Sequence, residues 1–435
     1  MSLSRHLTIC CAIAATLATA STAFAAPPGP AAIFAEAAGI CQRDGGRLWG
    51  HTLCGPILLA DPAAHTLAAN QADAEGQLQA QDGSWTGPMP ASMNGANTSA
   101  PWAGVRWTML VLPLPEDPRA RARLLAHEMF HRIQVDVGLE MANPANAHLE
   151  SEAGRYWLRL ELRALEAALE SGGASRQRAI RDALAFRAER WRLFPKAAEE
   201  EPALERNEGA AEYTGLRLDG SAPEAQVTQA CEQLRADRPS FVRSFAYVTG
   251  PAYGLLLDAL APAWKASLHR GIGLSTLLRD AAGDAATLNL AERAAVYYGA
   301  TLQAEEAARA KAIAARKASY RARLVDGPKL TLRHGAKMSI GFNPNNLLPL
   351  DELGTVYPTL RLSDEWGVLE VTDGALVSAD WSHTDVAAPS ASAQPAGGAA
   401  LQGPGWTLTL DPGWMLAEGT RRGDLLVRKI QQPAQ

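Results

Sequence analysis

The sequence His-Glu-x-x-His begins at His127 and ends at His131, with Glu128 directly after the first histidine. In an α-helix, residues four apart return to nearly the same face, about 40° around, so both imidazoles can reach one ion. A neighbouring carboxylate can then hold and deprotonate a water whose pKa the metal lowers to about 7. We therefore expect a metal held by His127 and His131, with Glu128 as general base. The alternative is a core or solvated histidine pair that binds no metal.

A helix must place these side chains on one face, and the surrounding residues predict one. Asp117 is a favourable N-cap, Pro118 suits the first helical position, and Gly138 follows the last apolar residue of the periodic pattern. A catalytic zinc takes three protein ligands and leaves one position open, so a third ligand is expected further along the chain. The helical segment Ala203 to Leu218 carries one candidate, Glu208, and Glu152 is a second.

The segment around Glu208 resembles the gluzincin metallopeptidases. In their aminopeptidase-like branch, the helix with the third ligand reads Asn-Glu-Gly, and an acidic residue often follows four positions later. Asn207-Glu208-Gly209 and Glu212 match both features. The resemblance implies that Glu208 is the third zinc ligand and that Glu212 orients a liganding histidine.

The spacing departs from the compact members of that family. Glu208 lies much farther from His131 than their third ligand does, which requires a helical insertion, whereas Glu152 lies near the compact spacing. However, Tyr156 stands four residues after Glu152, where an acidic residue would be expected. Zinc is inferred from the ligand set and the resemblance, and non-haem iron uses a similar set.

A wider pattern resembles bacterial exported proteins with a peptidase-MA-like domain. It combines His-Glu-x-x-His-x-x-Gln, which ends at Gln134, with Glu-Gly-x-Ala-Glu-Tyr, and it covers roughly residues 114–290. The resemblance implies a helical metallopeptidase core preceded by a sheet. Val105 to Leu112 is then either the edge strand along which a peptide substrate pairs or an interior strand.

A peptidase also needs a donor for the oxyanion of the tetrahedral intermediate. Tyr253 is the preferred candidate, because Gly250-Pro251 and Gly254 on either side indicate a tight break near a site. A tyrosine packed in the helical core is the alternative. The competing tyrosines are Tyr213, Tyr247 and Tyr297.

Length and composition indicate an ordinary globular protein of more than one domain. The chain has 435 residues, 47% hydrophobic and 20% charged, and a net charge of -5. No basic surplus is present, so nucleic acid is not an expected partner. The fold class predicted is α+β: a mainly helical zincin-like catalytic domain with a preceding small antiparallel sheet, and a C-terminal all-β domain. The predicted boundaries are 26–114 for an N-terminal β region packing on the catalytic domain, 115–325 for the helical domain and 326–435 for the C-terminal domain.

Residues 1–25 are predicted to be a signal peptide. Arg5 precedes an apolar stretch from Leu7 to Ala20, and Ala23-Phe24-Ala25 gives a small-x-small cleavage site. We therefore expect a periplasmic or secreted protein, with no stable membrane span in the mature chain. In an oxidising compartment Cys41 and Cys54 could form a disulfide that closes a local hairpin, leaving Cys231 as a buried thiol.

These patterns together predict a zinc-dependent metallohydrolase that cleaves peptides or proteins through a zinc-activated water. Two alternatives stay open. One is a non-catalytic periplasmic binding module on a degenerate peptidase scaffold, for which exposed tryptophans among Trp366, Trp381, Trp406 and Trp414 would provide a surface. The other is a zinc hydrolase of a non-peptide amide.

Overall fold

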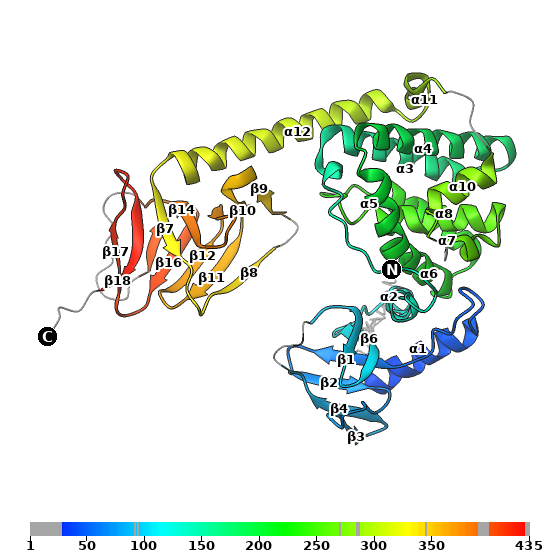
Figure 1. The fold of residues 1–435 in the computed structure, drawn as a ribbon, viewed down its shortest axis with the longest axis horizontal. Helices are drawn as coiled ribbons and strands as arrows, with labels where there is room; N and C mark the ends of the chain where they lie inside the picture. Colours follow the sequence, from blue (N-terminus) through cyan, green and yellow to red (C-terminus); the bar gives the residue numbers. More distant parts are fainter. Residues whose placement is uncertain are drawn as a thin grey trace, which may run out of the picture. The chain divides into compact units, whose positions relative to one another are not determined.

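The computed structural model describes residues 28–90, 93, 95–268, 271–283, 288–343, 346–389 and 400–430, and its fold is α+β, as predicted (Figure 1). The predicted signal peptide, 1–25, lies outside the described residues. The chain divides into two compact units, Met1–Arg47 with Thr52–Arg132, and Leu48–His51 with Ile133–Gln435. Within the described ranges, none of the helices combines the length and apolar character needed to cross a lipid bilayer.

The first unit contains a six-stranded sheet and two helices. Its strands follow the order β3-β4-β2-β1-β6-β5, and only the β1–β6 pair is parallel among the described pairings. The elements are α1 (Pro30–Asp44), β1 (Ile57–Asp61), β2 (Thr66–Ala69), β3 (Gln79–Gln81), β4 (Ser84–Pro88), β5 (Thr98–Trp102), β6 (Val105–Val111) and α2 (Pro118–Ile133).

The structure decides between the two alternatives for Val105 to Leu112 and corrects one expectation for this unit. Strand β6 is an interior strand, because it pairs with β1 on one side and with β5 on the other, so it offers no free edge to a peptide. The region predicted as β also begins with helix α1. Pro30 occupies its first position and Gly45, with φ +58°, ends it in the left-handed conformation, so local signals for this helix are present in the sequence.

In the helical part of the second unit, two long helices, α3 and α4, pack against each other. Helix α3 buries Leu158, Leu162, Leu165 and Leu169, which recur at helical spacing, and it packs against α4. The elements are η1 (Ala147–Glu150), α3 (Glu152–Glu170), α4 (Gly173–Leu193), α5 (Ala197–Leu204), η2 (Glu205–Gly209), α6 (Ala210–Leu218), α7 (Pro223–Arg235), α8 (Ala246–Leu260), α9 (Trp264–Leu268), α10 (Leu274–Ala282), α11 (Leu290–Val296), α12 (Gly299–Arg321) and η3 (Ala322–Asp326).

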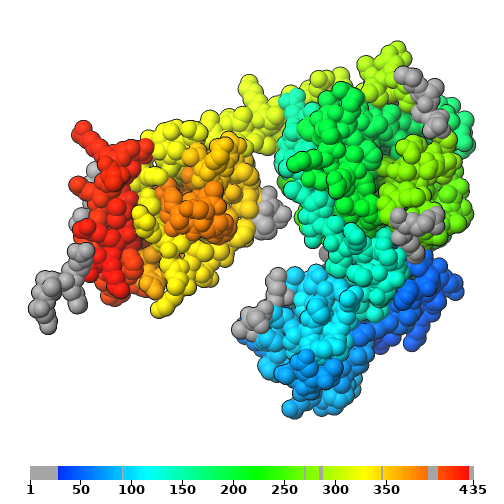
Figure 2. All heavy atoms as spheres, in the orientation of Figure 1, coloured from blue at the N-terminus to red at the C-terminus, as the bar shows by residue number. Residues whose placement is uncertain are grey.

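The strands after residue 328 form two sheets, and the atoms of this region are coloured yellow to red in Figure 2. One follows the order β17-β18-β7-β14-β13-β10-β9 and the other β15-β16-β12-β11-β8. Their elements are β7 (Lys329–Arg333), β8 (Ser339–Phe342), β9 (Leu348–Pro349), η5 (Asp351–Leu353), β10 (Thr355–Tyr357), β11 (Leu360–Asp364), β12 (Gly367–Val371), β13 (Ala375–Val377), β14 (His383–Ala387), β15 (Leu401–Gly403), β16 (Trp406–Leu410), β17 (Trp414–Glu418) and β18 (Leu425–Lys429).

Residues from both sheets share one apolar core, which includes Leu332, Leu369 and Val386. Trp366 and Trp406 are buried within it, and Trp414 packs against it half-buried. Trp381 differs, because 45% of its surface is exposed. Three of the four tryptophans therefore serve the core of this domain, and only Trp381 offers an accessible aromatic surface.

Candidate metal centre

Helix α2 carries the His-Glu-x-x-His sequence and begins as predicted. The carboxylate of Asp117 accepts a hydrogen bond from the backbone N–H of Ala120 at 2.8 Å, which caps the helix, and Pro118 is its first residue. The helix ends at Ile133, slightly before Gly138, whose φ of +76° lies in the left-handed region. This helix holds its two histidines one turn apart.

The imidazoles of His127 and His131 lie close together, and the carboxylate of Glu208 belongs to the same group of candidate ligands. The Nε2 atoms of His127 and His131 are 3.1 Å apart. One ligand atom from each of His127, His131 and Glu208 lies within 4.8 Å of the others, and all three residues are buried. Ligand atoms on a tetrahedral zinc ion lie about 3.3 Å apart, close to the separation of the two histidine nitrogens.

The donor set fits zinc chemistry. Two neutral imidazole nitrogens and one carboxylate form a three-ligand set that leaves a position open for water. Glu128, 5% exposed, lies beside the first histidine on α2. Among the described residues, this is the one group of three or more His, Cys, Asp or Glu side chains that could hold a metal ion. Glu152 is not part of it, because this residue is exposed at the start of α3.

Glu208 lies in a π turn, η2, between helices α5 and α6. A single π turn widens a helix locally, and such turns occur often at functional sites. Its next residue, Gly209, packs directly against Gly250 of α8. A Cβ atom at Gly250 would lie 2.3 Å from the Cα of Gly209, whereas one at Gly209 would lie 3.1 Å from the Cα of Gly250, so Gly250 is the more tightly constrained of the two. The glycine of Asn-Glu-Gly therefore lies at a close contact between two segments.

This packing brings side chains from α8 and the residues before it onto the Glu208 carboxylate. The Tyr247 hydroxyl donates to Oε2 at 2.5 Å, and the Arg243 guanidinium donates to Oε1 through Nη2 at 3.1 Å. Burial raises the pKa of the Tyr247 hydroxyl, and the negative charge of Glu208 raises it further. Tyr247 consequently stays protonated and acts as a hydrogen-bond donor to Glu208 at neutral pH.

Two residues of the sequence motifs, Gln134 and Asn207, are also hydrogen-bonded to each other. The side-chain amide of Gln134 donates to Oδ1 of Asn207 at 3.0 Å and to the backbone carbonyl of Glu140 at 3.0 Å. Asn207 in turn donates to the carbonyl of Ala142 at 2.9 Å and to Oε1 of Glu208 at 3.4 Å. The chain after α2 is thereby tied to the residue preceding Glu208. Sequence spacing identified both residues, but not their contact.

Tyr253, expected as the oxyanion donor, contacts Glu161, whereas Tyr247 is the tyrosine whose hydroxyl lies on the Glu208 carboxylate. Tyr253 is fully buried and its hydroxyl donates to Glu161 at 2.8 Å, so it belongs to an internal ion-pair network. Burial raises the pKa of this hydroxyl well above its ordinary value. Gly250 and Gly254 mark close helix contacts within α8 instead of a break near a site. The other two candidate tyrosines are engaged elsewhere: Tyr213 donates to Asp258, and Tyr297 donates to Asp182.

Glu212 lies on α6, four residues after Glu208, and is half-buried. Burial lowers the pKa of Arg238, and the charge of Glu212 partly offsets that change. The role expected for Glu212, orientation of a liganding histidine, stays a prediction.

A buried ion network anchors the π turn from the opposite side and was missed by the sequence reasoning. Arg187 of α4 makes two hydrogen bonds to Glu205, the first residue of η2, at 2.8 and 2.6 Å, and a third to Glu161 at 2.9 Å. Arg190 bonds Glu201 at 2.6 Å and Glu161 at 2.7 Å. Together with Tyr253, the residues of this network lie on four helices and a turn, so no local spacing could reveal it.

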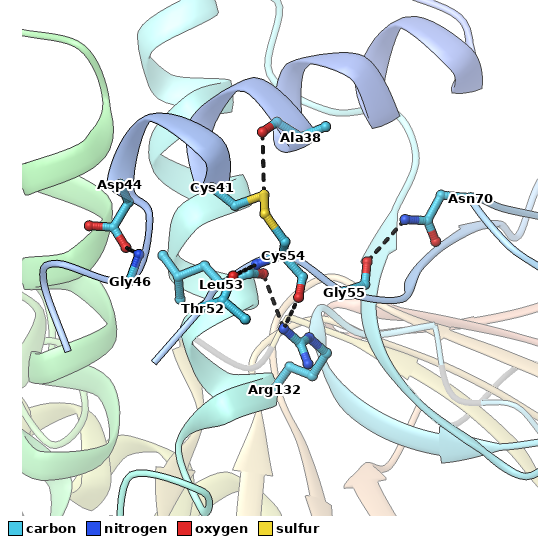
Figure 3. The surroundings of a disulfide bond; sticks show 10 residues. All are labelled: Ala38, Cys41, Asp44, Gly46, Thr52, Leu53, Cys54, Gly55, Asn70 and Arg132. Carbon is cyan, nitrogen blue, oxygen red and sulfur yellow. Dashed lines mark hydrogen bonds between the residues drawn. A yellow bond between two sulfur atoms is a disulfide. The ribbon is translucent and has the colours of Figure 1, made fainter. Parts of the chain in front are cut away.

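The predicted disulfide is present and joins Cys41 to Cys54, with a Cα–Cα distance of 5.1 Å (Figure 3). It links the last turns of α1 to the segment before β1, so it ties a helix to the sheet region and does not close a hairpin. Arg132 of α2 donates to the carbonyls of Leu53 and Cys54, both at 3.1 Å. Cys231 is a buried free thiol whose pKa burial raises to about 11.

No protein-family model, curated protein or solved structure matches the chain. The functional argument therefore depends on the geometry of the described residues.

Proposed function

We propose that the chain is an exported, zinc-dependent metallohydrolase of the gluzincin type that cleaves peptide bonds. The observation that supports this most directly is the convergence of His127, His131 and Glu208, with Glu128 beside the first ligand. The residues that carry the sequence resemblance are also the ones that lie together in the structure, which supports the proposal.

Bound zinc would supply a Lewis acid and a water activated at neutral pH. Glu128 would accept the proton of that water and pass it to the leaving amine nitrogen. Tyr247 and Asn207 would hold the Glu208 carboxylate in place, since ligating carboxylates need such partners. For Tyr247 to donate to a developing oxyanion, its single O–H would have to leave the Glu208 carboxylate.

Export is supported by the predicted signal peptide and by the disulfide. Disulfides persist in oxidising compartments and are rare where thiols are kept reduced. The same scaffold with no activity, or one acting on a non-peptide amide, would share this geometry. Those alternatives are separated by experiment.

The first test is metal analysis of the purified mature protein beside His131→Ala, Glu208→Ala and Glu152→Ala. Near-stoichiometric zinc in the wild type that is lost in the first two variants and kept in the third supports the proposed ligand set. A peptide-library screen would follow, with Glu128→Gln as the inactive control. A wild type that takes up no zinc even when it is supplied would refute the enzyme proposal, and a zinc protein that cleaves no peptide would favour the alternatives.

A further inference from the structure

Arg243 is a half-exposed cation beside the buried carboxylate of the candidate metal centre. Its side chain is 52% exposed, whereas that of Glu208 is 9% exposed. Its Nη2 donates to Glu208 at 3.1 Å and its Nη1 to Oδ1 of Asn143 at 2.8 Å. The guanidinium of Arg243 therefore contacts the buried Glu208 carboxylate and is itself open to solvent.

The contact with Glu208 uses only part of the hydrogen-bonding capacity of Arg243. Glu208 already accepts a hydrogen bond from Tyr247 on one oxygen and a weaker one from Asn207 on the other. A guanidinium has five N–H donors, and in the described part of the chain two of those of Arg243 have protein acceptors. The side chain of Arg243 is half exposed, so its remaining N–H donors are open to an approaching anion. Arg243 can thus bind a second anion at little cost.

Metal binding would make Arg243 more available to a second anion. Coordination by Glu208 shares the charge of the carboxylate with the cation, so the attraction between Glu208 and Arg243 falls. Arginine binds carboxylates through two parallel hydrogen bonds, a geometry that lysine cannot provide. A carboxylate on a substrate that approaches the metal centre would find this guanidinium at its edge.

We infer that Arg243 recognises a carboxylate of the substrate, so the substrate class is peptides that present a free carboxylate beside the metal centre. The inference rests on the proposed function. The carboxylate has two possible sources: the free C-terminus of the peptide, which would make the protein a carboxypeptidase, or an acidic side chain near the scissile bond. Both sources present the same planar anion to Arg243, and they are separated by the choice of peptide.

The experiment measures peptide binding to zinc-loaded Glu128→Gln protein, which removes the general base and so avoids turnover. Three versions of one peptide are compared by titration: a free C-terminal acid, its C-terminal amide, and an amide with one internal glutamate. We expect one acidic version to bind about tenfold or more tightly than the neutral amide, as for hydrogen bonds between charged groups. Adding Arg243→Gln should remove the difference, and Arg243→Lys should keep only part of it.

Two control variants separate recognition from support of the ligand. Tyr247→Phe removes a hydrogen bond to the same carboxylate but keeps the cation, so it should lower zinc affinity and leave the acid-to-amide ratio unchanged. Arg309→Gln removes an arginine that binds Glu150 and should leave both quantities unchanged.

Each outcome decides the inference. Equal binding of acidic and neutral peptides by a zinc-loaded protein whose parent cleaves peptides overturns the inference and leaves the proposed function standing. Unchanged preference in Arg243→Gln, with loss of zinc alone, shows that Arg243 only positions Glu208. A wild type without zinc or cleavage overturns the proposed function and the inference with it.

Discussion

Arg187→Met tests whether the buried ion network holds the π turn that carries Glu208. Arg187 is 1% exposed, and its two hydrogen bonds to Glu205 and one to Glu161 compensate two fully buried carboxylates. Burial would lower the pKa of Arg187, but the charges of Glu161 and Glu205 raise it well above its ordinary value, which indicates how strongly the three groups interact. Methionine has a similar length and no charge, so the substitution removes the compensation without opening a large cavity.

The expected cost is large because the partners cannot reach water. Breaking a buried pair by removing one partner costs about 3–5 kcal/mol in unfolding free energy. Glu205 is the first residue of the five-residue turn that also contains Glu208. A displaced Glu205 should therefore also disturb the position of the metal ligand Glu208. Loss of such support typically lowers metal affinity by about 10- to 100-fold.

Urea unfolding of the metal-free protein and zinc competition titrations measure these two effects separately. The matched control is Arg192→Met on the same helix, where the arginine pairs with Glu189 three residues away and its side chain is 67% exposed. This control should change neither quantity appreciably, because exposed pairs contribute little. Equal changes in both variants would refute the reasoning, and so would an Arg187→Met protein with unaltered zinc affinity.

Three further predictions concern other parts of the structure. Gly250→Ala should destabilise the protein by about 1–3 kcal/mol, because the added Cβ would lie 2.3 Å from the backbone of Gly209. Gly172→Ala, which has open space around it, should not have this effect. Thermal melting of both variants measures the difference. Cys41→Ser should cost about 3 kcal/mol through loss of the loop closed by the disulfide, and a reductant should lower the wild-type melting temperature but not that of the variant. Burial alone would raise the pKa of Glu201, but the charge of Arg190 lowers it far below its ordinary value. The stability from this pair is therefore fully present above about pH 4.5 and is lost as the pH falls through the folded-state pKa; urea midpoints between pH 6 and pH 3 should fall less steeply in Glu201→Gln.

Sequence reasoning found those parts of the candidate site that depend on local spacing. The histidine pair follows from helical periodicity, and Asn-Glu-Gly singled out Glu208 over Glu152 despite the unusual distance from His131. The capping residues of α2 were equally readable, because a cap involves neighbours in the chain.

The parts that failed depend on contacts between distant segments. Gly250-Pro251 predicted a break near Tyr253, but Pro251 lies within α8 and Gly250 serves a backbone contact with Gly209. No pattern along α8 distinguishes a glycine that ends a helix from one that admits another helix. Tyr247 was one of several equivalent tyrosines until the crossing of the two segments placed its hydroxyl on Glu208.

The π turn at Glu205–Gly209 also determines the directions in which its side chains point. A π turn accommodates one more residue than an α-helical turn, so it changes the directions in which the side chains of that turn point. Deletion of one residue there would restore an ordinary α-helix and change the directions of the side chains within this segment relative to one another. Glu205 and Glu208 could then no longer point to the ion network and to the histidines at the same time. The length of this short segment is consequently as constrained as the identity of its residues.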